Sequence, residues 1–142
     1  MIYFDTSYVA KCYLNETGSS AVRQLAESQP AIASSEYARI ELTSTFLRNL
    51  RDGFLTRAQF KLVLRQFESD DKSDIWIWLP VTSELCRKAS TRITTLPTAT
   101  FIRAGDALHL LTAQELGETE IWTKDRHLLA AAPHFGIAGR SV

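Results

Sequence analysis

The sequence lacks the features that mark several classes of protein. It has only two cysteines, Cys12 and Cys86, which are too few for a disulfide framework and lack the spacing of metal ligands. No basic stretch followed by a long apolar segment opens the chain, so we expect neither a secretory signal nor a membrane span. The simplest interpretation is a cytoplasmic protein with reduced thiols and no membrane partner.

An excess of charge of either sign is also missing. Sixteen basic residues balance sixteen acidic ones, so no overall positive field predicts nucleic-acid binding. The basic residues are nevertheless grouped, on two predicted central helices and in the acid-free interval 85–105. The members of these groups are Arg39, Arg48, Arg51, Arg57, Lys61 and Arg65, and Arg87, Lys88, Arg92 and Arg103. Basic helix faces are often simply solvated, but Arg103, and with it Arg48, is our first candidate for a contact with substrate phosphates.

The length and the order of the elements predict one α/β domain over residues 1–142. The chain is 45% apolar and shows no internal repeat, low-complexity tract or linker. We expect strands at 2–4, 31–33, 75–81 and 120–123 and around Ile137, and helices at 8–14, around 22–26, from Ser34 or Ser35 to about 52, from Thr56, and at 83–94, 105–116 and 126–132. Strands that alternate with helices favour a parallel sheet covered on both faces.

Two further patterns qualify this prediction. The acidic group Glu68, Asp70, Asp71 and Asp74 is interpreted as a solvated turn, and the segment 95–103 as a loop. The helix from residue 105 is nearly apolar all round, which indicates a central helix.

Four carboxylates lie at the edges of apolar runs, far apart in the sequence: Asp5, Glu41, Asp106 and Asp125. Asp5 and Asp125 follow predicted strands, and open α/β sheets bind ligands outside the carboxyl ends of their strands. Asp106 falls in the first turn of the predicted central helix. Glu41 shares a helical stripe with Tyr37, Ile40, Ser44 and Leu47, which predicts that it turns inward with the apolar face.

If these acids meet, with no basic residue beside them, they repel one another. The repulsion is about 4 kcal/mol per pair at ~4 Å for an effective dielectric of ~20. A hard divalent cation with oxygen ligands would compensate it, because Mg²⁺ is commonly held by one or two carboxylates and takes substrate phosphates as further ligands. The pattern therefore indicates a metal-dependent enzyme that acts on phosphate esters.

Each acid also has a simpler explanation. Asp125 is suited to cap the helix that begins at Arg126, Asp106 is an ordinary acid for a helix N-terminus, and Asp5 is a common turn residue after a strand. A carboxylate at Glu41, on an apolar stripe, is harder to explain in this way. The set is more specific than its members.

Several segments together resemble a known family. They are MIYFDTS at the start, RIELTS around Glu41, GDALHLLTA around Asp106, and TKDRHLL followed by FGI near the end. In this order and spacing, over essentially the whole chain, they resemble the PIN-domain ribonucleases, especially the VapC-like toxins of bacterial toxin–antitoxin pairs. The resemblance implies a three-layer α/β/α domain with a central, mainly parallel sheet, metal-dependent RNA cleavage, a cognate antitoxin partner and a homodimer.

Carried over by position, the resemblance also assigns the site. Asp5, Glu41, Asp106 and Asp125 match the acidic positions of the family, and Thr6 and Thr123 match its hydroxyl positions. In the expected mechanism, Asp5 and Asp106 anchor Mg²⁺ or Mn²⁺, while Glu41 and Asp125 bind a second ion or orient the attacking water. Thr6 or Ser7 would hold a carboxylate or a water, although a capping role suits both equally.

Two other functions remain open at this point. One is a different metal-dependent phosphohydrolase, but the DxD arrangement of haloacid-dehalogenase-type phosphatases is missing because Ser7 stands where the second aspartate would be. The other is a PIN-like domain that has lost catalysis and serves as an RNA-binding or scaffold module. The presence of all four acids argues against the latter.

The remaining conspicuous residues are expected to be structural. His109 lies one helical turn after Asp106, yet a histidine on a central helix is more often a hydrogen-bonded packing residue. Stacking on bases is an alternative for Trp76, Trp78 and Trp122, but a central strand favours a core position for Trp122, and Trp76 and Trp78 share one face of their strand. The stripe of Phe60, Val63, Leu64 and Phe67 is interpreted as core or subunit interface.

Overall fold

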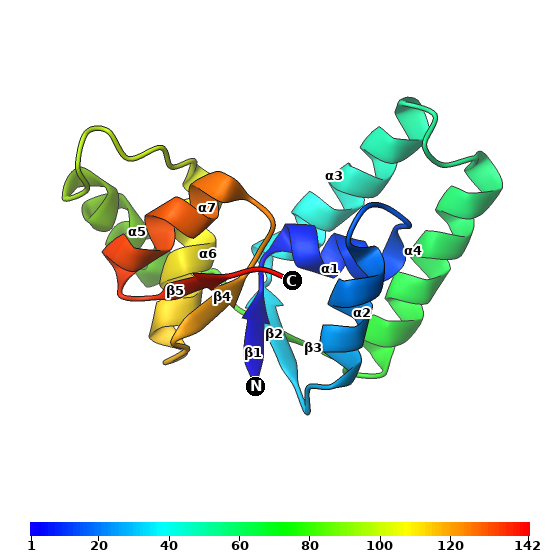
Figure 1. The fold of residues 1–142 in the computed structure, drawn as a ribbon, viewed down its shortest axis with the longest axis horizontal. Coiled ribbons are helices and arrows are strands. Elements are labelled where there is room, and N and C mark those ends of the chain that lie inside the picture. Colours follow the sequence, from blue (N-terminus) through cyan, green and yellow to red (C-terminus); the bar gives the residue numbers. More distant parts are fainter.

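The computed structural model describes residues 1–142 and has a single parallel sheet with helices on both of its faces (Figure 1). In chain order the elements are β1 (Ile2–Phe4), α1 (Thr6–Tyr13), α2 (Ser19–Glu27), β2 (Ile32–Ser35), α3 (Tyr37–Arg51), α4 (Arg57–Lys72), β3 (Trp76–Leu79), α5 (Ser83–Thr94), α6 (Ala104–Glu115), β4 (Glu120–Trp122), α7 (Arg126–Ala131), the 3₁₀ helix η1 (Ala132–Phe135) and β5 (Ala138–Arg140).

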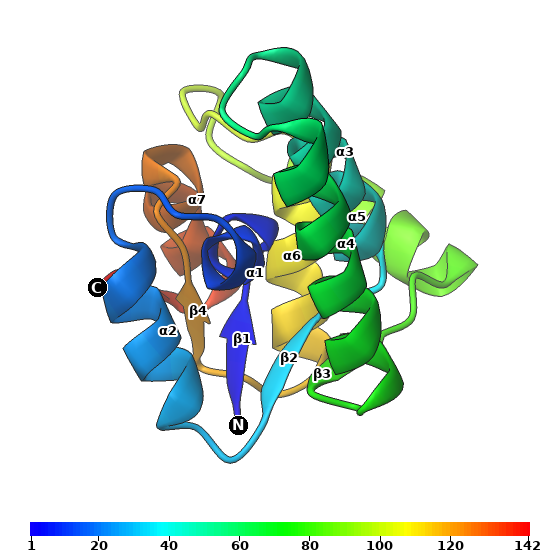
Figure 2. The same cartoon turned by 90° about the vertical axis from the view of Figure 1, so that its right-hand side faces the viewer.

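The five strands are arranged in the order β3-β2-β1-β4-β5, and every neighbouring pair is parallel. β1 lies in the centre, where Tyr3 is in register with Ala33 of β2 and Ile121 of β4. Figure 2 shows β1, β2 and β4 running in the same direction. The prediction of an α/β fold with a central parallel sheet is confirmed.

Two hydrophobic cores lie on opposite faces of the sheet. Side chains alternate along a strand, so Phe4 and Tyr3 point to opposite faces. Phe4 packs in a core with residues of α1–α4, and Tyr3 packs in a core with residues of α5–α7 and η1. Figure 1 shows these two groups of helices on either side of the strands. This is the three-layer α/β/α arrangement that the sequence predicted.

α6 is the central helix of the second core. Seven of its twelve residues are buried, including the polar Asp106, His109 and Thr112. Its nearly uniform apolar composition is therefore explained by contacts on most of its surface. No helix of the protein combines the length and the apolar composition that crossing a membrane requires.

The prediction of a solvated turn before β3 holds only for Asp74, which is exposed in the turn after α4, and is wrong for the other three acids of the group. α4 continues to Lys72, so Asp70 and Asp71 belong to its last turns. Tyr13 donates a hydrogen bond to Asp70 at 2.8 Å, and the Trp78 indole donates one to Asp71 at 2.7 Å. The helix extends through the acids because aromatic partners from other elements bind them, which local sequence does not reveal. The structural interpretation of Trp78 is supported by its contact with Asp71, and that of Trp76 by a hydrogen bond from its indole to the Tyr13 hydroxyl at 2.7 Å.

The predicted inward stripe of α3 is also wrong. The buried residues of this helix are Ala38, Leu42 and Phe46, whereas Ile40 is 69% exposed and Leu47 is 57% exposed. The stripe that carries Glu41 faces an open pocket rather than the core. The start of α3 differs as well, because Ser34 and Ser35 belong to β2, although the Ser35 hydroxyl accepts a hydrogen bond from the backbone N–H of Tyr37.

Gly139 on the edge strand β5 allows the strand to lie directly against α7. A Cβ at this position would lie 2.9 Å from Leu129 Cδ2 and 3.0 Å from Leu129 Cα. Because the nearest atoms include backbone, they cannot simply rotate away. We expect Gly139→Ala to destabilise the protein by about 1–3 kcal/mol through overpacking, which thermal unfolding would show as a lower Tm. Ala138→Ser, at the exposed neighbouring position, is the control and should leave Tm nearly unchanged.

Candidate active site

A pocket of about 520 Å³ opens at the carboxyl edge of the sheet, beside the ends of β1 and β4. The chain order reverses here, because β2 lies on one side of β1 and β4 on the other, and such switch points are where open α/β sheets bind ligands. All four sequence-predicted acids line the pocket. The polar residues of its lining include Asp5, Thr6, Ser7, Glu41, Arg48, Arg103, Asp106, His109 and Asp125.

Asp5 is the most enclosed of these acids, with 6% of its surface exposed. It ends β1 and caps α1, accepting hydrogen bonds from Ser7 Oγ at 2.7 Å and the Tyr8 N–H at 3.1 Å on Oδ1. Its Oδ2 accepts one from Thr123 Oγ1 at 2.6 Å. Burial nevertheless raises the pKa of Asp5, because desolvation outweighs the charge of His109 and these donors. A cation near Asp5 would relieve that cost.

Thr123 links Asp5 to Asp125. The buried hydroxyl that donates to Asp5 also accepts the backbone N–H of Asp125 at 2.9 Å. Asp125 in turn caps α7, because its Oδ1 accepts the N–H groups of His127 and Leu128. The simple capping explanation for Asp125 is therefore correct. The second carboxylate oxygen of Asp125 takes no part in the cap and faces the other residues of the pocket.

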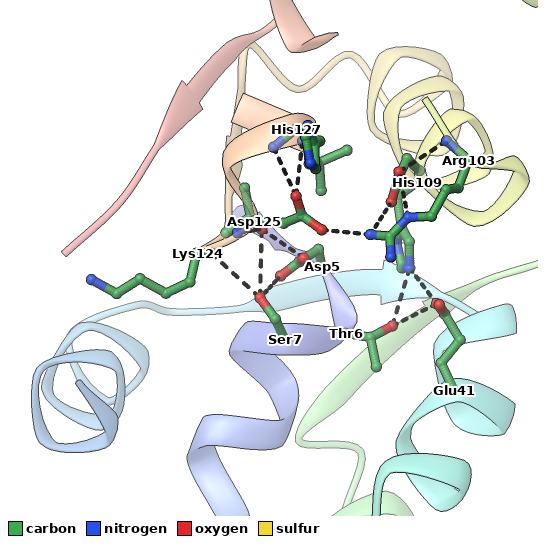
Figure 3. A network of polar contacts seen from close by, with 12 residues as sticks. Asp5, Thr6, Ser7, Glu41, Arg103, His109, Lys124, Asp125 and His127 are labelled. Carbon is green, nitrogen blue, oxygen red and sulfur yellow. Dashed lines mark hydrogen bonds and ion pairs between the residues drawn. The ribbon is translucent and has the colours of Figure 1, made fainter. Parts of the chain in front are cut away.

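Arg103 lies between Asp106 and Asp125. Figure 3 shows its guanidinium reaching Asp125. Its Nε and backbone N–H both donate to Asp106 Oδ2, at 3.1 and 3.0 Å, and Nη2 donates to Asp125 Oδ2 at 2.5 Å. The Asp106 hydrogen bond, followed by its charge, raises the pKa of the guanidinium. The expectation that no basic residue stands beside the acids is wrong, since loop residue Arg103 already neutralises part of their charge.

Glu41 enters from α3 and meets His109 of α6. His109 Nε2 lies 2.7 Å from Glu41 Oε1, and the Thr6 hydroxyl donates to the same oxygen at 2.7 Å. Desolvation by burial acts to raise the pKa of Glu41, but the hydrogen bond and charge of His109, together with Thr6, lower it overall. The other ring nitrogen of His109 lies 2.9 Å from the Tyr3 hydroxyl. Figure 3 shows Thr6, His109 and Glu41 converging at one point.

Comparison with protein families gives a match for the chain. The family model described as PIN domain matches residues 2–133. The chain belongs to the PIN domain family. No curated protein sequence matches this chain.

Solved structures share the fold of this PIN domain at low sequence identity. VapC20 of Mycobacterium tuberculosis, described as a sarcin–ricin loop cleaving toxin, has a TM-score of 0.72 and 18% identity over 92% of this chain and 95% of its own. The VapBC2 complex of Rickettsia felis, bound to a DNA fragment from its promoter, has a TM-score of 0.67 and 16% identity over 100% of this chain and 99% of its own. FitAcB of Neisseria gonorrhoeae has a TM-score of 0.69 and 16% identity over 98% of this chain and 96% of its own.

Some of the grouped basic residues of this PIN domain are engaged away from the pocket. Arg39 pairs with Glu36 and Asp71, and Lys88 pairs with Glu84 and Glu115. Of the ten basic residues grouped in the sequence, Arg48 and Arg103 are the two that line the pocket. They are the two that sequence reasoning placed first as substrate contacts.

The donor set of the PIN-domain pocket fits a hard divalent cation. Four carboxylates and the hydroxyls of Thr6 and Ser7 are oxygen ligands of the kind that Mg²⁺ and Mn²⁺ prefer. In the present arrangement no three acidic, histidine or cysteine side chains converge closely enough to hold an ion. Asp106 and Asp125 are instead bridged by Arg103, so an ion would need the guanidinium to leave the position between them.

Sequence reasoning missed Tyr3 in this PIN domain and ranked His109 below the four acids. Tyr3 is fully buried within a strand, where its hydroxyl needs a partner. The sequence signals for this pair are weak: a tyrosine in an otherwise apolar strand and a histidine three residues after Asp106. Their contact becomes evident only when α6 packs on the sheet. The expectation that His109 is a hydrogen-bonded packing residue is correct.

Proposed function

We propose that this PIN domain is a divalent-metal-dependent endoribonuclease that hydrolyses RNA phosphodiester bonds. The observation that carries the proposal is the convergence of Asp5, Glu41, Asp106 and Asp125, from four separate parts of the chain, on one pocket at the switch point of the sheet. Buried and half-buried carboxylates are costly unless paired or ligated, so such a cluster is built for a positive charge.

The residues have separate tasks in this proposal. Asp5 and Asp106 hold Mg²⁺ or Mn²⁺, and Glu41 and Asp125 hold a second ion or orient the attacking water. The bound cation supplies Lewis acidity to the water and to the scissile phosphate. Thr123 keeps Asp5 in place through the 2.6 Å hydrogen bond, and Thr6 does the same for Glu41 at 2.7 Å. No protein nucleophile is required.

Two arginines are the proposed phosphate contacts. Arg48 of α3 lines the pocket and is not one of the arginines paired with a carboxylate. Arg103 is paired, but 61% of its side chain is exposed, so it can exchange one anionic partner for another. Together they place positive charge on the rim of a pocket whose interior is acidic.

The biological role that we propose is the toxin of a toxin–antitoxin pair. The sequence resemblance to VapC-like toxins and the fold shared with VapC20, VapBC2 and FitAcB support it. The proposed partners are a small cognate antitoxin and a second copy of the chain. Exposed apolar side chains on the α3–α4 pair, including Phe54 at 78% and Leu62 at 61%, provide surface for such contacts. A neighbouring reading frame for a small DNA-binding protein would support the assignment.

The activity is tested by incubating the purified protein with a panel of structured RNAs in Mg²⁺, Mn²⁺ or a chelator. We expect endonucleolytic cleavage of at least one RNA with the metals and none with the chelator. Asp106→Asn should lower the rate by about a hundredfold or more, because it removes one charge from the proposed cation site. Asp52→Asn, at the exposed end of α3, is the matched control and should cleave at the wild-type rate.

Other outcomes separate the competing functions. Cleavage that survives both the chelator and Asp106→Asn would refute the site. RNA that is bound but never cut, with or without metal, would favour the non-catalytic binding module. Hydrolysis of small phosphate monoesters without RNA cleavage would favour a different phosphohydrolase.

A further inference from the structure

A row of hydrogen bonds runs from behind the acidic pocket into its lining, and two of its residues, Tyr3 and His109, have no task in the mechanism above. It begins at Tyr3 Oη, which lies 2.9 Å from His109 Nδ1, and continues from His109 Nε2 to Glu41 Oε1 at 2.7 Å. The Thr6 hydroxyl lies beside this row, 3.1 Å from His109 Nε2 and 2.7 Å from Glu41 Oε1. Three elements, β1, α6 and α3, are joined in this way.

Both ring nitrogens of His109 are engaged within the protein. The side chain is 4% exposed, and the ring packs edge-to-face on Tyr3 with centroids 5.9 Å apart. Since Nδ1 faces Tyr3 and Nε2 faces Glu41 and Thr6, neither nitrogen is available to a cation or to RNA. His109 therefore acts on the site through Glu41 and not by direct contact.

The chemistry of Glu41 fixes the direction of its hydrogen bond with His109. An ionised carboxylate only accepts, so the proton between His109 and Glu41 belongs to Nε2. Nδ1 accepts the hydroxyl proton of Tyr3 when the ring is neutral and donates to the Tyr3 oxygen when the ring is charged, and Tyr3 has no exposed surface. In either state both ring nitrogens and the Tyr3 hydroxyl have a partner within the protein.

The row leaves Glu41 with one unoccupied oxygen. Oε1 receives both His109 Nε2 and the Thr6 hydroxyl, whereas Oε2 forms no hydrogen bond within the protein. Oε2 lies over Gly105, where an added Cβ would be 3.3 Å away. The glycine at the start of α6 thus leaves room for the free oxygen. A glutamate on an open helix face would otherwise sample several rotamers.

We propose that His109 is a positioning residue for the nuclease centre, which holds Glu41 so that only Oε2 is offered to the cation or the attacking water, while Tyr3 holds His109. The inference rests on the proposed function, because it assigns Glu41 a task there. Supporting residues of this kind typically change activity by about 10–100-fold.

The test is a double-mutant cycle between His109 and Glu41. kcat and KM for one cleaved RNA are measured with saturating Mn²⁺ for the wild type, His109→Leu, Glu41→Ala and the double variant. We expect His109→Leu to lower kcat about 10–100-fold with little change in KM, and to cause no further loss in the Glu41→Ala background. Equal losses in both backgrounds, or a change confined to KM, would overturn the inference, because a general structural role acts whether or not Glu41 is present.

Two milder variants cover the case in which His109→Leu does not fold. Tyr3→Phe removes only the hydroxyl, and His109→Gln keeps an N–H donor. We expect a smaller loss of kcat for Tyr3→Phe, again absent in the Glu41→Ala background, and partial rescue by His109→Gln relative to His109→Leu. Tyr13→Phe, which removes a hydroxyl bonded to Asp70 far from the pocket, is the control and should keep the wild-type kcat.

The ring of His109 gives an independent readout. Imidazole ¹⁵N NMR should find the proton on Nε2 in the wild type and a weaker Nε2 preference in Glu41→Ala; a proton on Nδ1 alone would overturn the inference. If the wild type neither cleaves RNA nor binds Mn²⁺, the proposed function fails and this inference fails with it. If the wild type cleaves RNA and the losses are additive, only the inference fails.

Discussion

Asp5→Asn is expected to abolish metal-dependent RNA cleavage while the protein stays folded. Asp5 is the most enclosed acid of the pocket, and the amide removes its charge with almost no change of shape. Cation catalysis contributes several kcal/mol to such reactions, which corresponds to a rate loss of about a thousandfold. Single-turnover cleavage with saturating Mn²⁺ measures the effect. Asp74→Asn, an exposed acid after α4, is the control.

The same substitution, which should abolish cleavage, should maintain or raise the thermal stability of the metal-free protein. Burial raises the pKa of Asp5, so the folded protein disfavours the ionised form more than the unfolded chain does. The resulting loss of free energy of unfolding is absent at a pH below about 3.9, the pKa of aspartate in the unfolded chain. It grows as the pH rises toward the pKa of Asp5 in the folded protein and is fully present above that pKa. In chelator at neutral pH, we therefore expect Asp5→Asn to melt at or above the wild-type temperature.

Added metal should reverse this order. At a concentration a hundredfold above Kd, a cation that binds only the folded state stabilises it by about 2.7 kcal/mol. For a chain of this size that is a rise in Tm of roughly 6–10 °C. The wild type should show this rise and Asp5→Asn little of it. Equal rises in both proteins would mean that the cation binds elsewhere, and an active Asp5→Asn would refute the assignment of the acid.

Arg103→Gln should bind divalent cations more tightly than the wild type. The guanidinium bridges Asp106 and Asp125, so an entering cation must first break both ion pairs. Because 61% of the Arg103 side chain is exposed, solvent screens the pairs, and we allow each at most about 1 kcal/mol. The two pairs together then oppose cation binding by at most about 2 kcal/mol, so removing them raises the cation affinity by up to about thirtyfold. Electron paramagnetic resonance of free Mn²⁺ gives the two dissociation constants.

The matched control for this prediction is Arg140→Gln. Arg140 also pairs with a carboxylate, that of Glu120, but lines no part of the acidic pocket. It should leave the Mn²⁺ affinity unchanged, which separates a local effect from a change in net charge. An unchanged or weaker affinity of Arg103→Gln would show that the arginine does not occupy the place of the cation.

Local patterns in the sequence placed most elements well. The helix predicted at 83–94 is observed at Ser83–Thr94, and the one predicted to start at Thr56 begins one residue later, at Arg57, with Thr56 as its cap. These succeed because a capping side chain and a periodic apolar face act within a few residues of the chain. The four acids could be selected in the same way, since each interrupts or borders an apolar run.

Predictions that depended on distant partners fared worse. Asp70 and Asp71 were assigned to a turn, and their helix is extended by hydrogen bonds from Tyr13 and Trp78. The apolar stripe of Glu41 was expected to be buried, yet α3 packs through Ala38, Leu42 and Phe46. In both cases two local structures, helix or turn in one and either face of α3 in the other, are nearly equal in energy as far as the local sequence determines. Contacts with a neighbouring element decide between them.

The sequence by itself determined the α/β class, the positions of most helices and strands, and the identity of the acids, because these follow from periodicity and residue chemistry along the chain. Only the tertiary structure decided what stands beside those acids: Arg103 between Asp106 and Asp125, and His109 against Glu41. A charge or a hydrogen bond acts over a few ångströms in space, and the packing of α6 against β1 and α3 sets those distances.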